Sequence, residues 1–148
     1  MFFDRLKDRK NFERELEHLS PAAAYTAMTF AKLMAGEGFT IKKRMPIRYA
    51  HSQSFLAVLF ALLDFIQANW NEDDEDRSKQ FSEVLWFLFG DDAKLALSNF
   101  AVAFGTDGFH EIGRAVQDRL ANYLSGGLPK IDDMQTELGF LLEYVDRR

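Results

Sequence analysis

The stretch that decides the fold is Ser54-Phe-Leu-Ala-Val-Leu-Phe-Ala-Leu-Leu-Asp-Phe-Ile-Gln-Ala-Asn-Trp70. Its apolar side chains occupy every side of a helix, so no face is left for water. Asp64 follows nine consecutive apolar residues, a run well short of the roughly 18 that a bilayer-spanning segment requires. The stretch therefore predicts a central helix, over about residues 52–70, that other parts of the protein enclose.

The length and composition predict one well-filled domain. The chain has 148 residues, about the size of an average domain. Hydrophobic residues make up 47% of it and include 15 Phe, which is too apolar for a disordered chain. The absence of Cys excludes disulfides, thiolate metal sites and cysteine nucleophiles. The first ten residues lack the apolar core of a secretory signal, so we expect a single domain, residues 1–148, in the cytoplasm.

Six further helices are expected around the central one. Ser20 and Pro21 predict a helix start, because the Ser hydroxyl can cap free N–H groups and Pro needs no donor there. Asp91 and Asp92 are expected to cap the helix over residues 93–104, whose apolar side chains indicate a largely interior position. The expected fold is all-α, a single compact globular domain of about seven helices. Apolar residues at helical spacing place the six helices at about residues 2–19, 21–35, 77–89, 93–104, 109–124 and 130–148.

Charge is distributed unevenly along the sequence. Residues 1–71 carry 10 basic and 7 acidic side chains, whereas residues 72–148 carry 8 basic and 16 acidic ones. If the fold keeps the two halves apart, the second half attracts basic partners and repels nucleic acid. Residues 39–48 read as a loop with a small basic cluster, which is too small for nucleic-acid binding by an acidic chain. The cluster consists of Lys42, Lys43, Arg44 and Arg48.

Two patterns superficially match metal sites, and neither is sufficient. Glu15 and His18 form a Glu-x-x-His pair on one helix face, but di-iron bundles use two such pairs. The run Glu72-Asp-Asp-Glu-Asp76 has carboxylates at the spacing of a calcium loop, but Arg77 stands where that loop needs Gly. We therefore expect no metal, no cofactor and a solvated acidic loop between two helices.

Asp64 is the single charge in the middle of the central stretch. An unpartnered buried carboxylate is costly, so we expect either a pair with a basic residue, such as one of residues 42–48, or a functional position facing a cavity. General acid–base catalysis needs a second titratable group nearby, and none lies within helical reach. Phosphate-binding Gly loops, Gly-x-Ser-x-Gly and kinase signatures are also absent from the sequence, so an enzyme is not expected.

These features favour a protein that binds another protein through an acidic surface, as small inhibitors and bacterial toxin-immunity proteins do. A basic partner such as a nuclease toxin would be attracted to it, whereas nucleic acid and membranes are not expected partners. The alternative is a helical ligand-binding domain with an apolar pocket for a lipid-like or aromatic small molecule. We expect a monomer, or a homodimer formed through terminal helices that carry Phe2 and Phe3. The expected partner-binding residues are Glu72, Asp73, Asp74, Glu75, Asp76, Asp91, Asp92 and Trp70.

Overall fold

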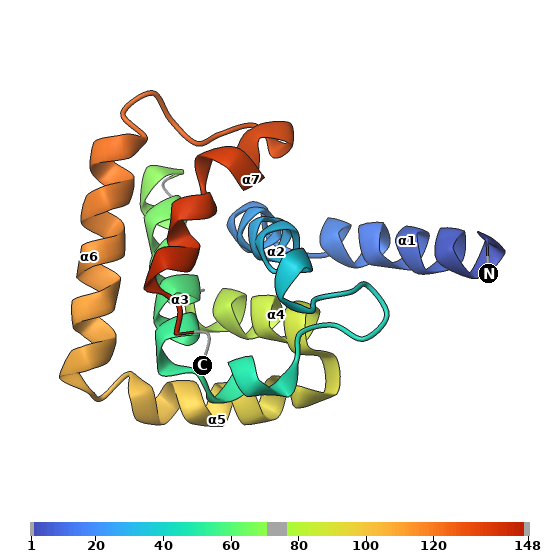
Figure 1. Cartoon of the computed structure of the whole chain (residues 1–148), viewed down its shortest axis with the longest axis horizontal. Helices are drawn as coiled ribbons and strands as arrows, with labels where there is room; N and C mark the ends of the chain where they lie inside the picture. Colours follow the sequence, from blue (N-terminus) through green and yellow to red (C-terminus); the bar gives the residue numbers. More distant parts are fainter. Residues whose placement is uncertain (1, 71–76, 147–148) are drawn as a thin grey trace.

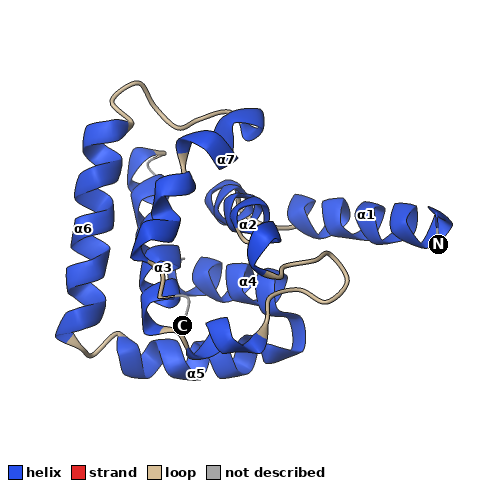
Figure 2. Cartoon of the chain, viewed as in Figure 1, coloured by secondary structure: helices blue, strands red, loops and turns tan. Residues whose placement is uncertain are grey.

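The computed structural model describes residues 2–70 and 77–146, which form seven α-helices and no strand (Figures 1 and 2). The all-α fold class is therefore confirmed. Short 3-10 helices lie at Ala35–Glu37, Ile47–His51, Gly90–Asp92, Ile131–Asp133 and Gly139–Tyr144. The α-helices are α1 (Phe2–Glu17), α2 (Pro21–Leu33), α3 (Gln53–Asn69), α4 (Arg77–Phe89), α5 (Ala93–Ala103), α6 (Asp107–Tyr123) and α7 (Met134–Glu137).

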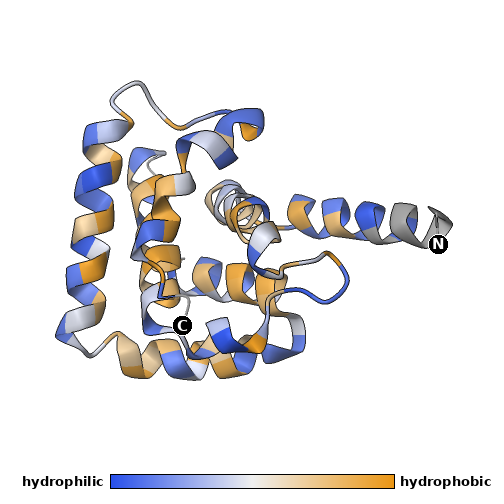
Figure 3. Cartoon of the chain, viewed as in Figure 1, coloured by the Kyte–Doolittle hydropathy of each residue, from blue (hydrophilic) through white to orange (hydrophobic). Residues whose placement is uncertain are grey.

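Helix α3 lies at the centre, and α2, α4, α5 and α6 all contact it (Figure 1). Its bounds differ from the prediction by one residue at each end, because Ser52 and Trp70 serve as its caps. The Ser52 hydroxyl accepts a hydrogen bond of 3.1 Å from the N–H of Phe55. Figure 3 shows apolar residues gathered on α3 and α4, whereas α1 and α6 alternate between apolar and polar residues. The outer helices are therefore amphipathic covers for the apolar central one.

One side of α3 is packed by aromatic rings. The ring of Phe55 meets those of Phe30, Tyr49 and Phe89 at centroid distances of 5.5, 5.3 and 5.9 Å. The contacts with Phe30 and Phe89 are edge-to-face, with interplanar angles of 87°. Such pairs add about 0.5–1.5 kcal/mol to the energy of burial. These rings fasten α2, α4 and the 3-10 helix Ile47–His51 to the first turn of α3.

Helix α5 is less interior than its sequence predicts. Its buried residues are Ala93, Ala96 and Ala103, whereas Val102 is 74% exposed. The alanines allow α5 to lie close against α4 and the 3-10 helix Ile47–His51, while Leu95, Leu97 and Phe100 are only partly buried against the core. Asp92 is the N-cap residue of α5 as predicted, but its side chain makes no cap hydrogen bond. A 3-10 turn runs directly into α5 and supplies backbone acceptors instead.

The C-terminal segment is not the single helix predicted over residues 130–148. Helix α7 ends at Glu137, and a 3-10 helix follows over Gly139–Tyr144. Gly139 is unfavourable within an α-helix. Leu138 and Leu141 are fully buried at a spacing of three residues, which suits a 3-10 helix. Packing of this segment against α3 and α6 therefore overrides the helical periodicity.

Helix α1 projects from the body of the molecule (Figure 1). Its C-terminal half is attached through Phe12, whose ring lies 4.6 Å from that of Phe87. Arg44 stacks over both rings and pairs with Glu15 at 2.8 Å. This part of the basic cluster therefore anchors the loop over residues 39–48. The predicted homodimer relies on Phe2 and Phe3. Their side chains lie outside the described part of the structure.

Candidate functional site

The acidic run, residues 72–76, lies outside the described residues together with residue 71, whereas Trp70 and Arg77 are described. Trp70 is the C-cap of α3 and is 42% exposed. Its ring meets the ring of Tyr25 edge-on, at a centroid distance of 5.7 Å. Arg77 begins α4. The two ends of the run are therefore attached to defined positions of the fold.

A network of five polar side chains holds the start of α4 against α3 and α6. Arg77 pairs with Asp64 at 3.0 Å and donates from Nε to Oε1 of Gln67 at 3.3 Å. Gln67 in turn donates from Nε2 to Oε1 of Gln80. Gln117 of α6 donates from Nε2 to the second carboxylate oxygen of Asp64, at 2.8 Å. The network therefore joins three helices next to the acidic run.

The network pairs Asp64 with Arg77 rather than with a residue of the loop over residues 39–48. The two charged side chains are 27% and 34% exposed, so solvent screening limits their contribution to about 1 kcal/mol or less. Gln67 and Gln80 are buried, and their mutual hydrogen bond removes most of the cost of burying two amides. The two glutamines thus extend the Asp64–Arg77 ion pair into a hydrogen-bonded network between α3 and α4. The sequence pattern does not predict their contact.

Asp91 and Asp92 lie at the other end of α4. This helix has 13 residues, and a helix of that length spans about 20 Å. Asp91 is exposed, and Asp92 is partly exposed. The fold therefore does not bring Asp91 and Asp92 beside Trp70, and the predicted partner-binding residues do not form one contiguous surface among the described residues.

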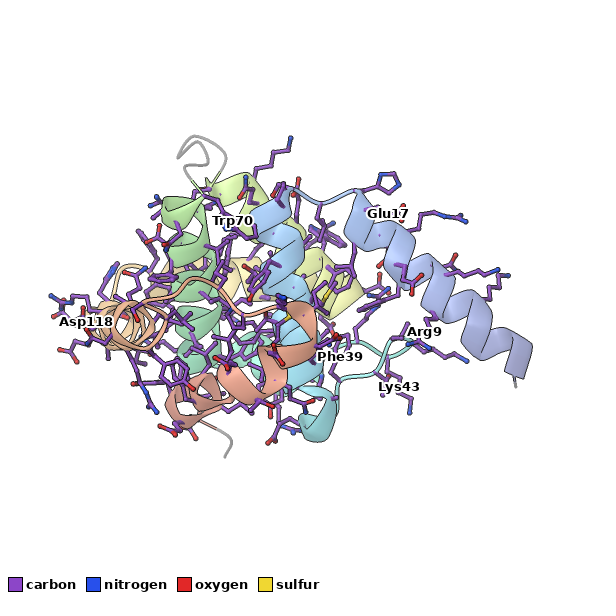
Figure 4. All side chains as sticks on the ribbon, turned by 90° about the horizontal axis from the view of Figure 1, so that it is seen from above. Arg9, Glu17, Phe39, Lys43, Trp70 and Asp118 are labelled. Atoms are coloured by element: carbon purple, nitrogen blue, oxygen red, sulfur yellow. The ribbon has the colours of Figure 1, made fainter. Side chains whose placement is uncertain are left out.

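Acidic side chains are concentrated on α6 and the segment after it, whereas α1 carries five basic and five acidic residues. Figure 4 shows Arg9 and Lys43 on the side of α1, and Asp118 on α6 at the opposite end of the molecule. On α6 and the segment after it, acidic side chains outnumber basic ones among the described residues. The exposed acidic residues there are Asp107, Glu111, Asp118, Asp132, Asp133, Glu137, Glu143 and Asp146.

Among the described residues, the fold clearly raises the pKa values of Tyr25 and Arg119 and lowers that of Glu143. Burial raises the pKa of Tyr25 to about 12, and its hydroxyl donates to the carbonyl of Pro129 at 2.6 Å. This bond ties α2 to the segment before α7, beneath Trp70. A hydrogen bond from Arg119 lowers the pKa of Glu143, which joins α6 to the 3-10 helix Gly139–Tyr144.

Asp64 and Arg77 also line a groove of about 460 Å³ between α3 and α6. The floor of this α3/α6 groove is formed by Ala57 and Ala61 of α3 and Gly113 of α6. These three residues have one side-chain carbon or none, so they leave the space between the helices unfilled. The expectation that α3 has no face open to solvent is therefore wrong at this groove.

The described residues offer little to a metal ion. No group of three or more His, Asp or Glu side chains among residues 2–70 and 77–146 is placed to hold one. Glu15, from the Glu-x-x-His pair, contacts Arg44 instead, and His18 is exposed. None of the described helices combines the length and apolar character that crossing a bilayer requires.

Comparisons of the chain with protein-family models, with curated proteins and with solved structures found no match.

Proposed function

We propose that the protein is an interaction module that binds a basic protein partner through the acidic run between α3 and α4. One observation supports this most directly. Five consecutive acidic residues, Glu72-Asp-Asp-Glu-Asp76, connect two helix ends that the network around Gln67 and Arg77 holds together. A concentrated negative charge attracts an oppositely charged partner and accelerates association.

Trp70 is proposed as the aromatic anchor of this surface. It lies two residues before the acidic run, and its ring is partly exposed while it contacts the ring of Tyr25. Tryptophan is enriched among the residues that contribute most binding energy at protein interfaces. The contact with Tyr25 restricts the indole before binding, so less conformational entropy is lost in the complex. Asp91 and Asp92, at the far end of α4, are proposed to act through the long-range field of the protein.

A stoichiometric inhibitor or immunity-type protein is the form of interaction that this surface suits best. An enzyme that acts on nucleic acid carries a basic surface, and an acidic protein competes for such a surface. The proposed role requires no catalysis by this chain and neither metal nor cofactor. It also places the protein in the cytoplasm, in keeping with the absence of Cys.

The test is a comparison of two charge variants with the partner captured by the tagged full chain from its native source. Asp73→Asn, Asp74→Asn and Asp76→Asn together are expected to slow association about tenfold at low salt. Asp132→Asn, Asp133→Asn and Glu137→Gln together change the charge equally at exposed positions of the 3-10 helix Ile131–Asp133 and of α7. This control is expected to change the association rate less than about twofold. Equal effects of the two variants, or none at low salt, would contradict the proposal.

The anchor role of Trp70 has its own matched control. Trp70 and Trp86 are 42% and 43% exposed, but Trp86 lies on α4, away from the acidic run. Trp70→Ala is expected to raise the dissociation rate of the same partner about tenfold or more. Trp86→Ala is expected to leave it within about twofold. If Trp86→Ala raised the dissociation rate and Trp70→Ala did not, the partner would bind the surface around Trp86 instead.

A further inference from the structure

The α3/α6 groove is open where a larger side chain would fit. A Cβ atom added to Gly113 would meet no atom within 4 Å beyond its own helix and immediate neighbours. Gly113 lies in the interior of α6, where Gly is about 1 kcal/mol less favourable than Ala. The groove volume of about 460 Å³ falls among those typical of small-molecule sites. Space of this size therefore remains at a position where the helix itself would favour a side chain.

One wall of the groove is aromatic. Phe60, Phe104 and Phe109 contact one another at centroid distances of 5.8 to 6.0 Å. Phe104 is 44% exposed at the edge of this wall. The Phe104 carbonyl accepts a hydrogen bond of 2.6 Å from Nε2 of His110, which holds the wall in place. An aromatic ligand covering these rings would remove apolar surface from water and gain edge-to-face contacts.

The charged residues that line the groove carry a net positive charge. Asp64 and Arg77 both line the groove, and they neutralise each other through their ion pair. Arg114 also lines it, is exposed, and makes no ion pair with another residue in the described part of the chain. The groove therefore has positive character in a protein whose net charge is −5. A guanidinium group in this position suits a carboxylate, which it binds through two parallel N–H···O bonds.

We propose that the α3/α6 groove binds a small planar aromatic carboxylate. The ring system lies against Phe60 and Phe104 above Gly113, and the carboxylate pairs with Arg114. The ligand and surface differ from those of the acidic-run proposal, so either proposal can fail without the other.

The first test titrates 2-naphthoate and its neutral counterpart 2-naphthamide into the full chain, with binding followed by calorimetry and amide NMR shifts. The naphthoate is expected to bind with a dissociation constant on the order of 1 mM or below. The naphthamide is expected to bind about fivefold more weakly or worse, because it cannot pair with the guanidinium of Arg114. Failure of the naphthoate to bind would overturn the proposal, as would equal affinity for the two compounds.

The second test locates the site. Gly113→Leu fills the groove and is expected to weaken naphthoate binding about tenfold or more. Ala115→Leu adds the same side chain at an exposed position about 200° around α6, and affinity is expected to stay within about twofold. Arg114→Met is expected to weaken naphthoate binding about fivefold without affecting naphthamide. Lys94→Met, an exposed change of equal charge on α5, is its control.

Folding of each variant is checked by circular dichroism, and Phe104→Ala replaces Gly113→Leu if the latter does not fold. Phe104 is partly exposed, so its truncation removes the outer wall of the groove at small cost to the core. Unchanged naphthoate affinity in the folded groove variant would overturn the proposal. Equal losses in Gly113→Leu and Ala115→Leu would do the same.

Discussion

Helix α3 is buried on two sides by different means. On one side, Phe55 packs against Phe30 and Phe89, and none of the three is more than 3% exposed. On the other side, Ala57 and Asp64 line a groove between α3 and α6, and a hydrogen bond from Gln117 to Asp64 joins the two helices. Tight aromatic packing leaves no space for another molecule. Small and polar residues on the second side leave both space and charged groups, so we propose the ligand site on that side.

The energetic difference between the two sides is tested most strongly by Phe55→Ala. This change removes a fully buried ring that contacts Phe30, Tyr49 and Phe89. We expect it to lower the free energy of unfolding by about 3–5 kcal/mol, as lost burial and a cavity both contribute. Urea unfolding measures this change. Phe104→Ala, at the groove, makes the same chemical change and is expected to cost less than about 1 kcal/mol, because Phe104 is 44% exposed.

A comparable cost for Phe55→Ala and Phe104→Ala would contradict the contrast between the two sides. It would mean that the aromatic wall of the groove contributes to stability as much as the core does. Unequal costs in the expected direction would instead leave Phe104 available for a role in binding.

The polar network is expected to give an intermediate effect. Gln67→Leu removes the hydrogen-bond partner of Gln80, which is itself buried. An unsatisfied buried amide costs about 1–3 kcal/mol. The double change Gln67→Leu and Gln80→Leu removes both polar groups, so it is expected to be more stable than the sum of the two single changes predicts. Urea unfolding of the four proteins measures the coupling, and strict additivity would show that the two side chains act independently.

The parts of the fold that the sequence predicts well are those with local signals. Ser20 and Pro21 begin α2 as expected, because a cap and a first-turn Pro act within one turn of helix. The apolar run likewise identifies α3 without reference to any neighbour. The burial of α5 is overestimated from the sequence. Which of its side chains are buried depends on how closely α4 approaches, and the sequence does not give that distance.

The candidate site was predictable only in part. Trp70 and the acidic run stand out by composition, and the position of Asp64 within an apolar run predicts a partner for its carboxylate. Gln67 and Gln80 carry no such signal, since glutamine is common on exposed helix faces. Their contact arises because α3 and α4 meet near the connection between them. Gly113 is similar: its lack of a side chain becomes informative only when the helix facing it is known.

The smallest expected effect concerns Tyr25, which lies where the packed side of α3 ends at Trp70. Tyr25→Phe removes the hydrogen bond to the Pro129 carbonyl and is expected to cost about 1 kcal/mol near neutral pH. The pKa of Tyr25 is about 12 in the fold, against about 10 in an unfolded chain. The unfolded chain therefore loses this proton first, so the contribution of Tyr25 is complete below about pH 10 and declines as pH rises towards about 12.

The stability difference between the wild type and Tyr25→Phe is therefore expected to shrink between about pH 10 and about pH 12. Urea unfolding at several pH values measures it, and subtracting the variant removes the contributions of other groups that titrate in the same range. Tyr123→Phe is the control for removing a tyrosine hydroxyl, because Tyr123 is 56% exposed. A stability difference that stays constant with pH would show that burial does not raise the pKa of the Tyr25 hydroxyl. Tyr25 would then support Trp70 through the contact between their rings alone.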